Sequence, residues 1–292
     1  GKASAQRLDA MVAQLAQQMG DFGTELIKTG IPEQKSSVST GRIEARKLWF
    51  KYRDGPYVVK NVSACCQAGE ITAVMGGNGA GKSTLLQLLG GIHQAKRGSL
   101  RVDCWTGREV RAEKMAGTVG YLSQNPNDYL WKKTVQEEVL FTPELLKKRD
   151  PEWLNTVTRA MDLKALWHMN PRQLSMGERM RVAIASVLSC RPGILLLDEP
   201  TRAFDSTSRE RLAKLLTDLA MGGASIVLAT HDTEFVAEYA DRVLLMHEGT
   251  AVSTGSTREV LGESMFYAPA ACRVFRGIND LVFNWKDGQR WV

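Results

Sequence analysis

Residues 71–83 read ITAVMGGNGAGKS, and this stretch decides the class of fold. Its first five residues are apolar, which predicts a short strand buried on both faces. The rest fits the pattern G-x-x-x-x-G-K-S between a strand and a helix, in which backbone N–H groups and the helix start bind phosphate oxygens. Lys82 should reach the β and γ phosphates, and the Ser83 hydroxyl should bind Mg²⁺. The residues expected to hold the nucleotide are consecutive: Gly76, Gly77, Asn78, Gly79, Ala80, Gly81, Lys82, Ser83 and Thr84.

Three more apolar segments share the character of the first, at Val119–Leu122, Ile194–Leu197 and Ile226–Ala229. Helical patterns lie between them, as at Lys82–Leu89 and Arg179–Leu188. Alternating strands and helices predict an α/β fold, with a mostly parallel sheet covered by helices.

Each later strand runs into a polar residue that can take part in chemistry. Gln124 follows the second strand, Asp198 and Glu199 close the third, and His231 follows the fourth. Because ligands of open α/β sheets bind beyond the carboxyl ends of the strands, we expect these side chains to meet the glycine-rich loop in one site. There Asp198 would bind Mg²⁺, and Glu199 would act as the general base toward the attacking water.

Composition argues against several other classes of protein. The 292 residues include 38 Lys and Arg against 32 Asp and Glu, a net charge of +6 without long runs of one sign. This balance permits contact with nucleic acid or an anionic membrane but argues for neither, and we expect no nucleic-acid partner. No segment approaches the roughly 18 apolar residues of a spanning helix, so any work at a membrane would need a partner. The five cysteines show no paired spacing and predict reduced, mostly buried thiols.

The chain divides into three predicted regions. Residues 1–42 combine a helical apolar stripe with a polar linker, and are either the tail of a preceding fused unit or a separate docking helix. Residues 43–262 carry the strand and helix pattern and all the motifs. Residues 263–292 form a short C-terminal extension.

Residues 174–178 read LSMGE and open a predicted helix. With the glycine-rich loop and the acidic strand end, they make residues 43–262 resemble the ATP-binding domains of ABC transporters. The resemblance implies a P-loop ATPase with a parallel core sheet, an antiparallel β subdomain and an α-helical subdomain that carries this signature. It also implies that Ser175 and Gly177 bind ATP held by a second unit, in a head-to-tail dimer. Met176 stands where the family has the first signature glycine, whereas Gly177 is kept.

Other residues match further positions of the family. By this resemblance Tyr52 stacks on adenine and Gln124 senses Mg²⁺ and the attacking water, and links to the transport partner. Asp205 reaches across the dimer, and His231 contacts the γ-phosphate. Phe204 replaces the usual leucine before Asp205, which leaves the rate of turnover open.

A finer resemblance lies in residues 124–130, QNPNDYL, and 134–139, TVQEEV. These are similar to the ATPases of energy-coupling factor importers, which take up vitamins or metal ions. The similarity implies a second ABC ATPase unit, identical, different or fused, and integral membrane transporter subunits as partners. It also implies a peripheral position of this chain at the cytoplasmic face of the cell membrane.

Two alternatives are a soluble ABC-type ATPase acting on the ribosome or DNA, and a non-catalytic partner subunit. The compact spacing from Lys82 to Ser175 leaves no room for the long insertions of DNA-repair relatives, and ribosome-acting relatives lack the pattern at 125–139. The presence of Glu199 and His231 disfavours the non-catalytic subunit.

Overall fold

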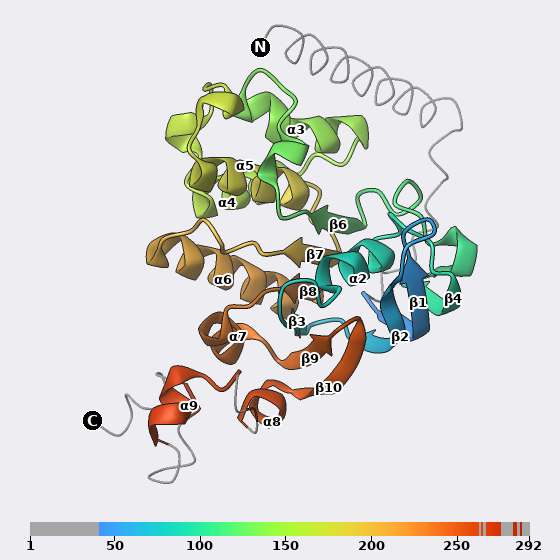
Figure 1. The fold of residues 1–292 in the computed structure, drawn as a ribbon. Coiled ribbons are helices and arrows are strands. Elements are labelled where there is room, and N and C mark those ends of the chain that lie inside the picture. Colours follow the sequence, from blue (N-terminus) through green and yellow to red (C-terminus); the bar gives the residue numbers. More distant parts are fainter. Residues whose placement is uncertain (1–40, 263, 265–266, 276–282, 285–286, 288–292) are drawn as a thin grey trace, which may run out of the picture. The chain divides into compact units, whose positions relative to one another are not determined.

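The computed structural model describes residues 41–262, 264, 267–275, 283–284 and 287. These residues form a six-stranded sheet in the order β10-β9-β3-β8-β7-β6 and a four-stranded sheet in the order β2-β1-β4-β5, flanked by helices (Figure 1). The strands are β1 Ile43–Lys51, β2 Tyr57–Cys66, β3 Ile71–Met75, β4 Arg97–Val102, β5 Trp105–Thr106, β6 Val119–Leu122, β7 Ile194–Asp198, β8 Ser225–Ala229, β9 Arg242–His247 and β10 Thr250–Ser256. The α-helices are α2 Lys82–Leu89, α3 Val135–Leu145, α4 Pro151–Ala160, α5 Met176–Leu188, α6 Ser206–Met221, α7 Thr233–Tyr239, α8 Thr257–Gly262 and α9 Ala270–Phe275. Short 3-10 helices are η1 Gly107–Glu109, η2 Pro126–Tyr129, η3 Lys164–Leu166 and η4 Pro171–Gln173.

Strands β3, β7 and β8 of the six-stranded sheet are buried on both faces, as their continuous apolar residues predict. Strand β7 shows this directly, because Leu195 and Leu197 enter one hydrophobic cluster while Ile194 and Leu196 enter another. The first cluster lies against α5 and α6, and the second lies against α2 and the four-stranded sheet. Strands β9, β3, β8, β7 and β6 run parallel, and β10 pairs antiparallel with β9. The predicted α/β fold with a parallel core sheet and an antiparallel β subdomain is therefore confirmed, with one antiparallel strand at the edge of the core sheet.

Helices α3, α4 and α5 gather beyond the β6 edge of the core sheet (Figure 1), where α3 and α4 both pack on α5. Helix α5 begins at Met176, three residues before the predicted start at Arg179. The reason is local: Ser175 is the N-cap, and Ser175 and Glu178 form a reciprocal capping box that satisfies N–H groups at the helix start. The prediction placed the start too late because it followed the apolar pattern and not the cap.

The cysteine prediction is correct in one respect and wrong in another. All five thiols are free, but Cys66 is the only one that is buried, while Cys65 and Cys104 are exposed and Cys190 and Cys272 are half-buried. Cys65 and Cys66 are neighbours on β2, and because successive side chains of a strand point to opposite faces, only one of them reaches the core.

The two terminal regions are described only in part. Residues 1–40, predicted to hold a helix and a linker, lie outside the described residues. In the C-terminal extension, the backbone N–H of Ala270 donates to Glu234 on α7 at 2.6 Å, and Phe283 joins the hydrophobic cluster beside α5 and α6. Among the described residues, every helix is too short or too polar to cross a membrane.

Candidate active site

A cavity of about 820 Å³ lies at the carboxyl ends of β3, β6, β7 and β8. Of the residues at these strand ends, the glycine-rich loop, Gln124, Asp198, Glu199 and His231 all line it. The structure thus brings together in one place the side chains that the strand ends predicted. The complete lining is Val58, Gly76, Gly77, Asn78, Gly79, Ala80, Gly81, Lys82, Ser83, Thr84, Gln124, Asp198, Glu199, Arg202 and His231.

The glycine-rich loop packs between β2 on one side and β9 with the turn after it on the other. Gly76 has φ +145°, and a Cβ there would lie 2.2 Å from the carbonyl oxygen of Met246. Gly81 has φ +98°, and its Cβ would lie 2.7 Å from the carbonyl oxygen of Val58. The N–H of Gly249 also donates to the carbonyl of Ala80 at 3.1 Å. Only glycine fits the two closest approaches, so the neighbouring backbone fixes the curvature of the loop before any ligand binds.

Lys82 is held at the inner end of this loop. Its side chain is buried, and Nζ donates to the carbonyls of Gly76 at 2.8 Å and Gly77 at 3.1 Å. Helix α2 starts at Lys82, and its N-cap Gly81 offers no side chain to satisfy the first N–H groups. A helix start with free N–H groups beside an ammonium is a site for anionic phosphate.

Asp198 and Ser83 supply oxygen atoms of the kind that Mg²⁺ prefers. Asp198 is buried, and burial raises the pKa of its carboxyl, an effect that a hydrogen bond with Ser83 partly offsets. The carboxylate of Glu199 raises the pKa of Asp198 further, since a second negative charge lies close. A carboxylate, a hydroxyl and the Gln124 amide suit a Mg²⁺ ion that keeps its other positions for phosphate and water.

Glu199 lies directly against His231. Its Oε1 is 2.9 Å from Nδ1 of His231, and the Thr230 hydroxyl donates to Oε2 at 3.4 Å. Glu199 has φ +51°, a left-handed conformation that is costly for a non-glycine residue and that here turns the chain sharply out of β7. Its N–H donates to the carbonyl of Ala229 at 2.8 Å, which holds this turn against β8. The carboxylate is thus fixed at the cavity wall with one oxygen on an imidazole, an arrangement suited to orienting and deprotonating a water molecule.

Tyr52 contacts α2 and does not line the cavity. Its hydroxyl lies 3.0 Å from the Thr84 hydroxyl and donates to Gln87 at 3.0 Å, while its ring meets Phe50 and His93 edge-on. The residue is still 43% exposed, so part of its surface remains open to a ligand.

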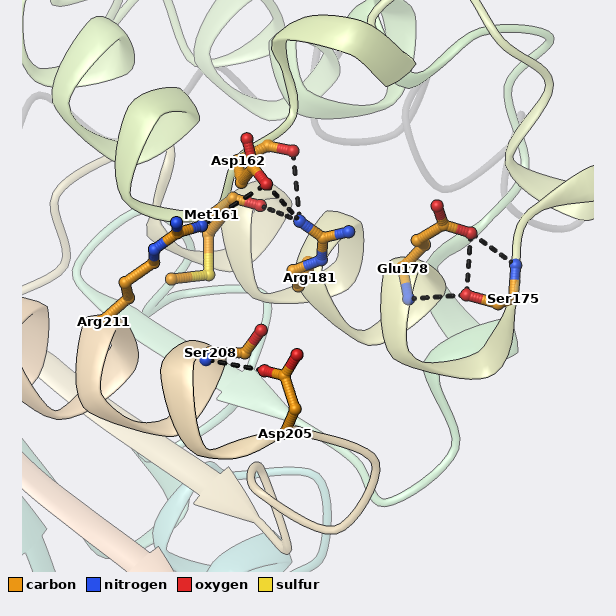
Figure 2. A network of polar contacts seen from close by, with 8 residues as sticks. All are labelled: Met161, Asp162, Ser175, Glu178, Arg181, Asp205, Ser208 and Arg211. Atoms are coloured by element: carbon orange, nitrogen blue, oxygen red, sulfur yellow. Dashed lines mark hydrogen bonds and ion pairs between the residues drawn. The ribbon is translucent and has the colours of Figure 1, made fainter.

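The predicted second phosphate site lies apart from the cavity lining. Ser175 and Asp205 are exposed, and with Gly177 they are absent from the cavity wall. Ser175 caps α5: its N–H and hydroxyl donate to Glu178 at 2.8 and 2.7 Å (Figure 2). Asp205 caps α6 by accepting the N–H of Ser208 at 2.8 Å, and the hydrogen bonds from Ser208 lower the pKa of the Asp205 carboxyl.

The structure gives a reason for glycine at position 177 that the sequence did not show. A Cβ at this position would lie 2.9 Å from the carbonyl oxygen of Ala203, in the loop that leads to Asp205. The helix that carries the signature therefore lies close against the loop before α6, and glycine permits that approach.

A second link joins α5 to α6 through Asp162, just after α4 (Figure 2). Oδ2 of Asp162 lies 3.4 Å from Arg181 on α5 and 3.4 Å from Arg211 on α6. Arg181 also donates to the carbonyls of Met161 and Asp162 at 3.1 Å each, which satisfies acceptors at the C-terminal end of α4. Three helices thus meet at one carboxylate.

The sequence profile described as ABC transporter matches residues 59–202. The energy-coupling factor transporter ATP-binding protein EcfA of Methanocaldococcus jannaschii is 34% identical over 254 residues, which cover 84% of this chain and 90% of that protein. The chain belongs to the ABC transporter family of ATP-binding proteins.

Other relatives of this ABC ATPase differ in length. An ABC transporter ATP-binding protein from Clostridium tetani is 40% identical over 240 residues, which cover 82% of this chain but only 55% of that protein. Among solved structures, cbiO1 from Clostridium perfringens, part of the ABC transporter complex cbiONQ, shares 32% identity at a TM-score of 0.65, with 76% of this chain and 90% of that chain covered. The ATP-binding cassette MJ0796, a dimer bound to ADP and Pi, shares 27% identity at a TM-score of 0.67, with 74% and 99% covered.

In this ABC ATPase, hydrogen bonds from its own side chains hold the segment after Gln124 in place. Asp128 accepts from Ser123 at 2.6 Å and from Asn125 at 3.2 Å. Buried Glu138 accepts the N–H groups of residues 131 and 132 at 2.6 and 2.7 Å, and burial raises the pKa of its carboxyl. The segment that resembles energy-coupling factor ATPases is therefore a loop held by side-chain hydrogen bonds, and it ends at α3.

Sequence reasoning missed two residues of the cavity wall, Val58 and Arg202. Val58 lies on β2 and reaches the site only because the antiparallel sheet packs beside the glycine-rich loop, so no local pattern could have indicated it. Arg202 offered a signal that was available, namely a cation three residues after Glu199.

Proposed function

We propose that this chain hydrolyses MgATP to drive an energy-coupling factor importer of a vitamin or a metal ion. The observation that carries the proposal is the cavity in which Lys82, Asp198 and the Glu199–His231 pair meet around a preformed phosphate loop. ATP binding follows from membership of the ABC family, whereas the metal ion, the direction of transport and the cargo belong to the proposal.

Each cavity residue takes a role that its position supports. The loop amides and Lys82 bind the β and γ phosphates, and Ser83, Asp198 and Gln124 hold the Mg²⁺ ion, which neutralises phosphate charge when bound. Glu199 orients the attacking water and accepts its proton, and His231 fixes that carboxylate and contacts the γ-phosphate.

The active unit in this proposal is a head-to-tail dimer. Ser175 and Gly177 sit at the start of α5, outside the cavity that holds Lys82. They can therefore complete the site of a second ABC unit, identical, different or fused, with Asp205 reaching across the same interface. The dimeric structure of the MJ0796 cassette with ADP and Pi gives a precedent in a related protein.

Membrane partners belong to the same proposal. The likeness to EcfA and to cbiO1 of the cbiONQ complex supports integral membrane subunits and a peripheral position at the cytoplasmic face of the membrane. Within the chain, Arg179 on the signature helix α5 donates to Asn127 at 3.0 Å. This contact links the loop after Gln124 to α5. Movement of the signature would therefore be transmitted to a partner docked beside that loop.

Two measurements test the proposal. Titration calorimetry with MgATP should show binding to the native chain and to a Lys114→Ala control, which removes an exposed lysine outside the cavity lining, but none to Lys82→Ala. Affinity retained in Lys82→Ala would refute the phosphate site. Purification of the full-length protein from its native membranes in mild detergent should recover polytopic subunits, and recovery with ribosomes or DNA alone would refute the transport role.

A further inference from the structure

Arg202 stands in the cavity wall next to the proposed base. It follows Glu199 in a tight turn in which the N–H of Arg202 approaches the carbonyl of Glu199 at 3.4 Å. Both residues line the same cavity, on the loop that leaves β7. The turn therefore places Arg202, an exposed residue, and Glu199, a buried one, beside the same open cavity.

The guanidinium of Arg202 is free to bind a ligand. Among the described residues, no hydrogen bond or ion pair engages its side chain, although Glu199 is only three positions away and binds His231 and Thr230 instead. Other arginines nearby are engaged, since Arg209 pairs with Asp232 and Arg181 with Asp162.

The cavity lining holds two cationic side chains, Lys82 and Arg202, and two carboxylates, Asp198 and Glu199, so an anionic ligand depends here on specific donors and not on net charge. The Lys82 ammonium already donates to two carbonyls of the loop. Arg202 lies on the wall that carries Glu199 and His231, where the terminal phosphate must face the attacking water. A planar guanidinium donates two parallel hydrogen bonds to phosphate oxygens, which an ammonium cannot do.

We propose that Arg202 binds the γ-phosphate of the nucleotide held in the same subunit and stabilises the charge that develops on it during hydrolysis. This inference rests on the proposed ATPase function. In the reaction the water oxygen bonds to the γ-phosphorus while Glu199 takes a water proton, and the bond to the bridging oxygen breaks with its electron pair leaving on ADP. Arg202 offsets negative charge on the equatorial oxygens throughout, a role that in other phosphoryl-transfer enzymes contributes about 10³- to 10⁵-fold in rate.

The test compares a nucleotide that has a γ-phosphate with one that lacks it. Affinities for Mg·AMP-PNP and Mg·ADP are measured by calorimetry on Arg202→Ala, Arg202→Lys and a control, Arg108→Ala, which removes an exposed arginine that does not line the cavity. Light scattering checks that the protein is monomeric at the concentration used. We expect Arg202→Ala to weaken Mg·AMP-PNP by about 10- to 100-fold, as for loss of a hydrogen bond between charged groups, with Mg·ADP affinity and Tm unchanged. Arg202→Lys should bind Mg·AMP-PNP with an affinity between those of the native chain and Arg202→Ala, because lysine keeps the positive charge but cannot donate two parallel hydrogen bonds.

Three results would overturn the inference. Unchanged affinity for both nucleotides would show that Arg202 does not touch the ligand, and equal loss for both would indicate a structural role. A loss that appears only at concentrations where dimers form would assign Arg202 to the partner's nucleotide. Lys82→Ala, measured in parallel, separates the two proposals. If Lys82→Ala loses nucleotide binding while Arg202→Ala binds normally, the inference about Arg202 fails and the proposed ATPase function stands.

Discussion

Replacing Gly76 with alanine should destabilise the protein far more than the same change at Gly77, although the two residues are neighbours in one loop. Gly76 has φ +145°, and its new Cβ would lie 2.2 Å from the carbonyl oxygen of Met246. A Cβ at Gly77 would meet no atom within 4 Å. Gly79 separates the two effects, because it has φ +79° and also meets nothing within 4 Å.

The structure gives a magnitude for each variant. At Gly76 the disfavoured backbone conformation costs about 1–3 kcal/mol. The Met246 carbonyl must also retreat by roughly 1 Å, a local overpacking worth about 1–3 kcal/mol. The sum, about 2–6 kcal/mol, is a large part of a typical folding free energy of about 5–15 kcal/mol. Gly79→Ala should cost about 1–2 kcal/mol, and Gly77→Ala should be neutral or stabilise by up to about 1 kcal/mol.

Guanidinium unfolding without nucleotide measures these differences, because the ligand would add its own binding energy to the variants that still bind it. We expect the free energy of unfolding to rank Gly77→Ala highest, then Gly79→Ala, then Gly76→Ala. The reasoning is refuted if Gly77→Ala loses as much stability as Gly76→Ala, or if Gly79→Ala is the least stable of the three.

Three further predictions follow from contacts of single side chains. Glu199→Gln keeps a partner for His231 but removes the proton acceptor, so phosphate release should fall by about 10²- to 10⁴-fold while ATP still binds and dimers accumulate in light scattering; near-native turnover would exclude Glu199 as the base. Tyr52→Phe should retain ATP affinity because the ring remains, whereas Tyr52→Ala should lose about 1–3 kcal/mol of binding, and equal affinities in calorimetry would exclude stacking on adenine. Burial raises the pKa of Glu138, so the folded protein keeps this proton at a pH where the unfolded chain has lost it, and stability falls as pH rises through that interval. Glu138→Gln still accepts the N–H groups but cannot ionise, so its Tm should fall less than that of the native chain as pH rises above about 4.5, and parallel Tm curves would contradict the burial argument.

The sequence predicted those parts of the molecule whose signals are local. Strand β3 and the loop after it are recognisable because an apolar run, fixed glycines and Lys82 occur within a short stretch. The reason for Gly177 was out of reach, since the carbonyl of Ala203 comes close only after β7 and α6 have packed. Strand β9, whose Met246 carbonyl shapes the phosphate loop, was missed for the same reason. The start of α5 was within reach, because Ser175 and Glu178 have the spacing of a capping box.

The shared carboxylate of Asp162 bears on which subunits can pair. It ties the helix capped by Ser175 to the helix capped by Asp205, and Gly177 lets the loop before the second helix approach the first. In a head-to-tail dimer both ends of this assembly would meet the partner together, at a spacing fixed within one subunit. A cell with several such ATPases could then sort them by that spacing: a partner matching one end but not the other would be rejected without any contact at Asp162 itself.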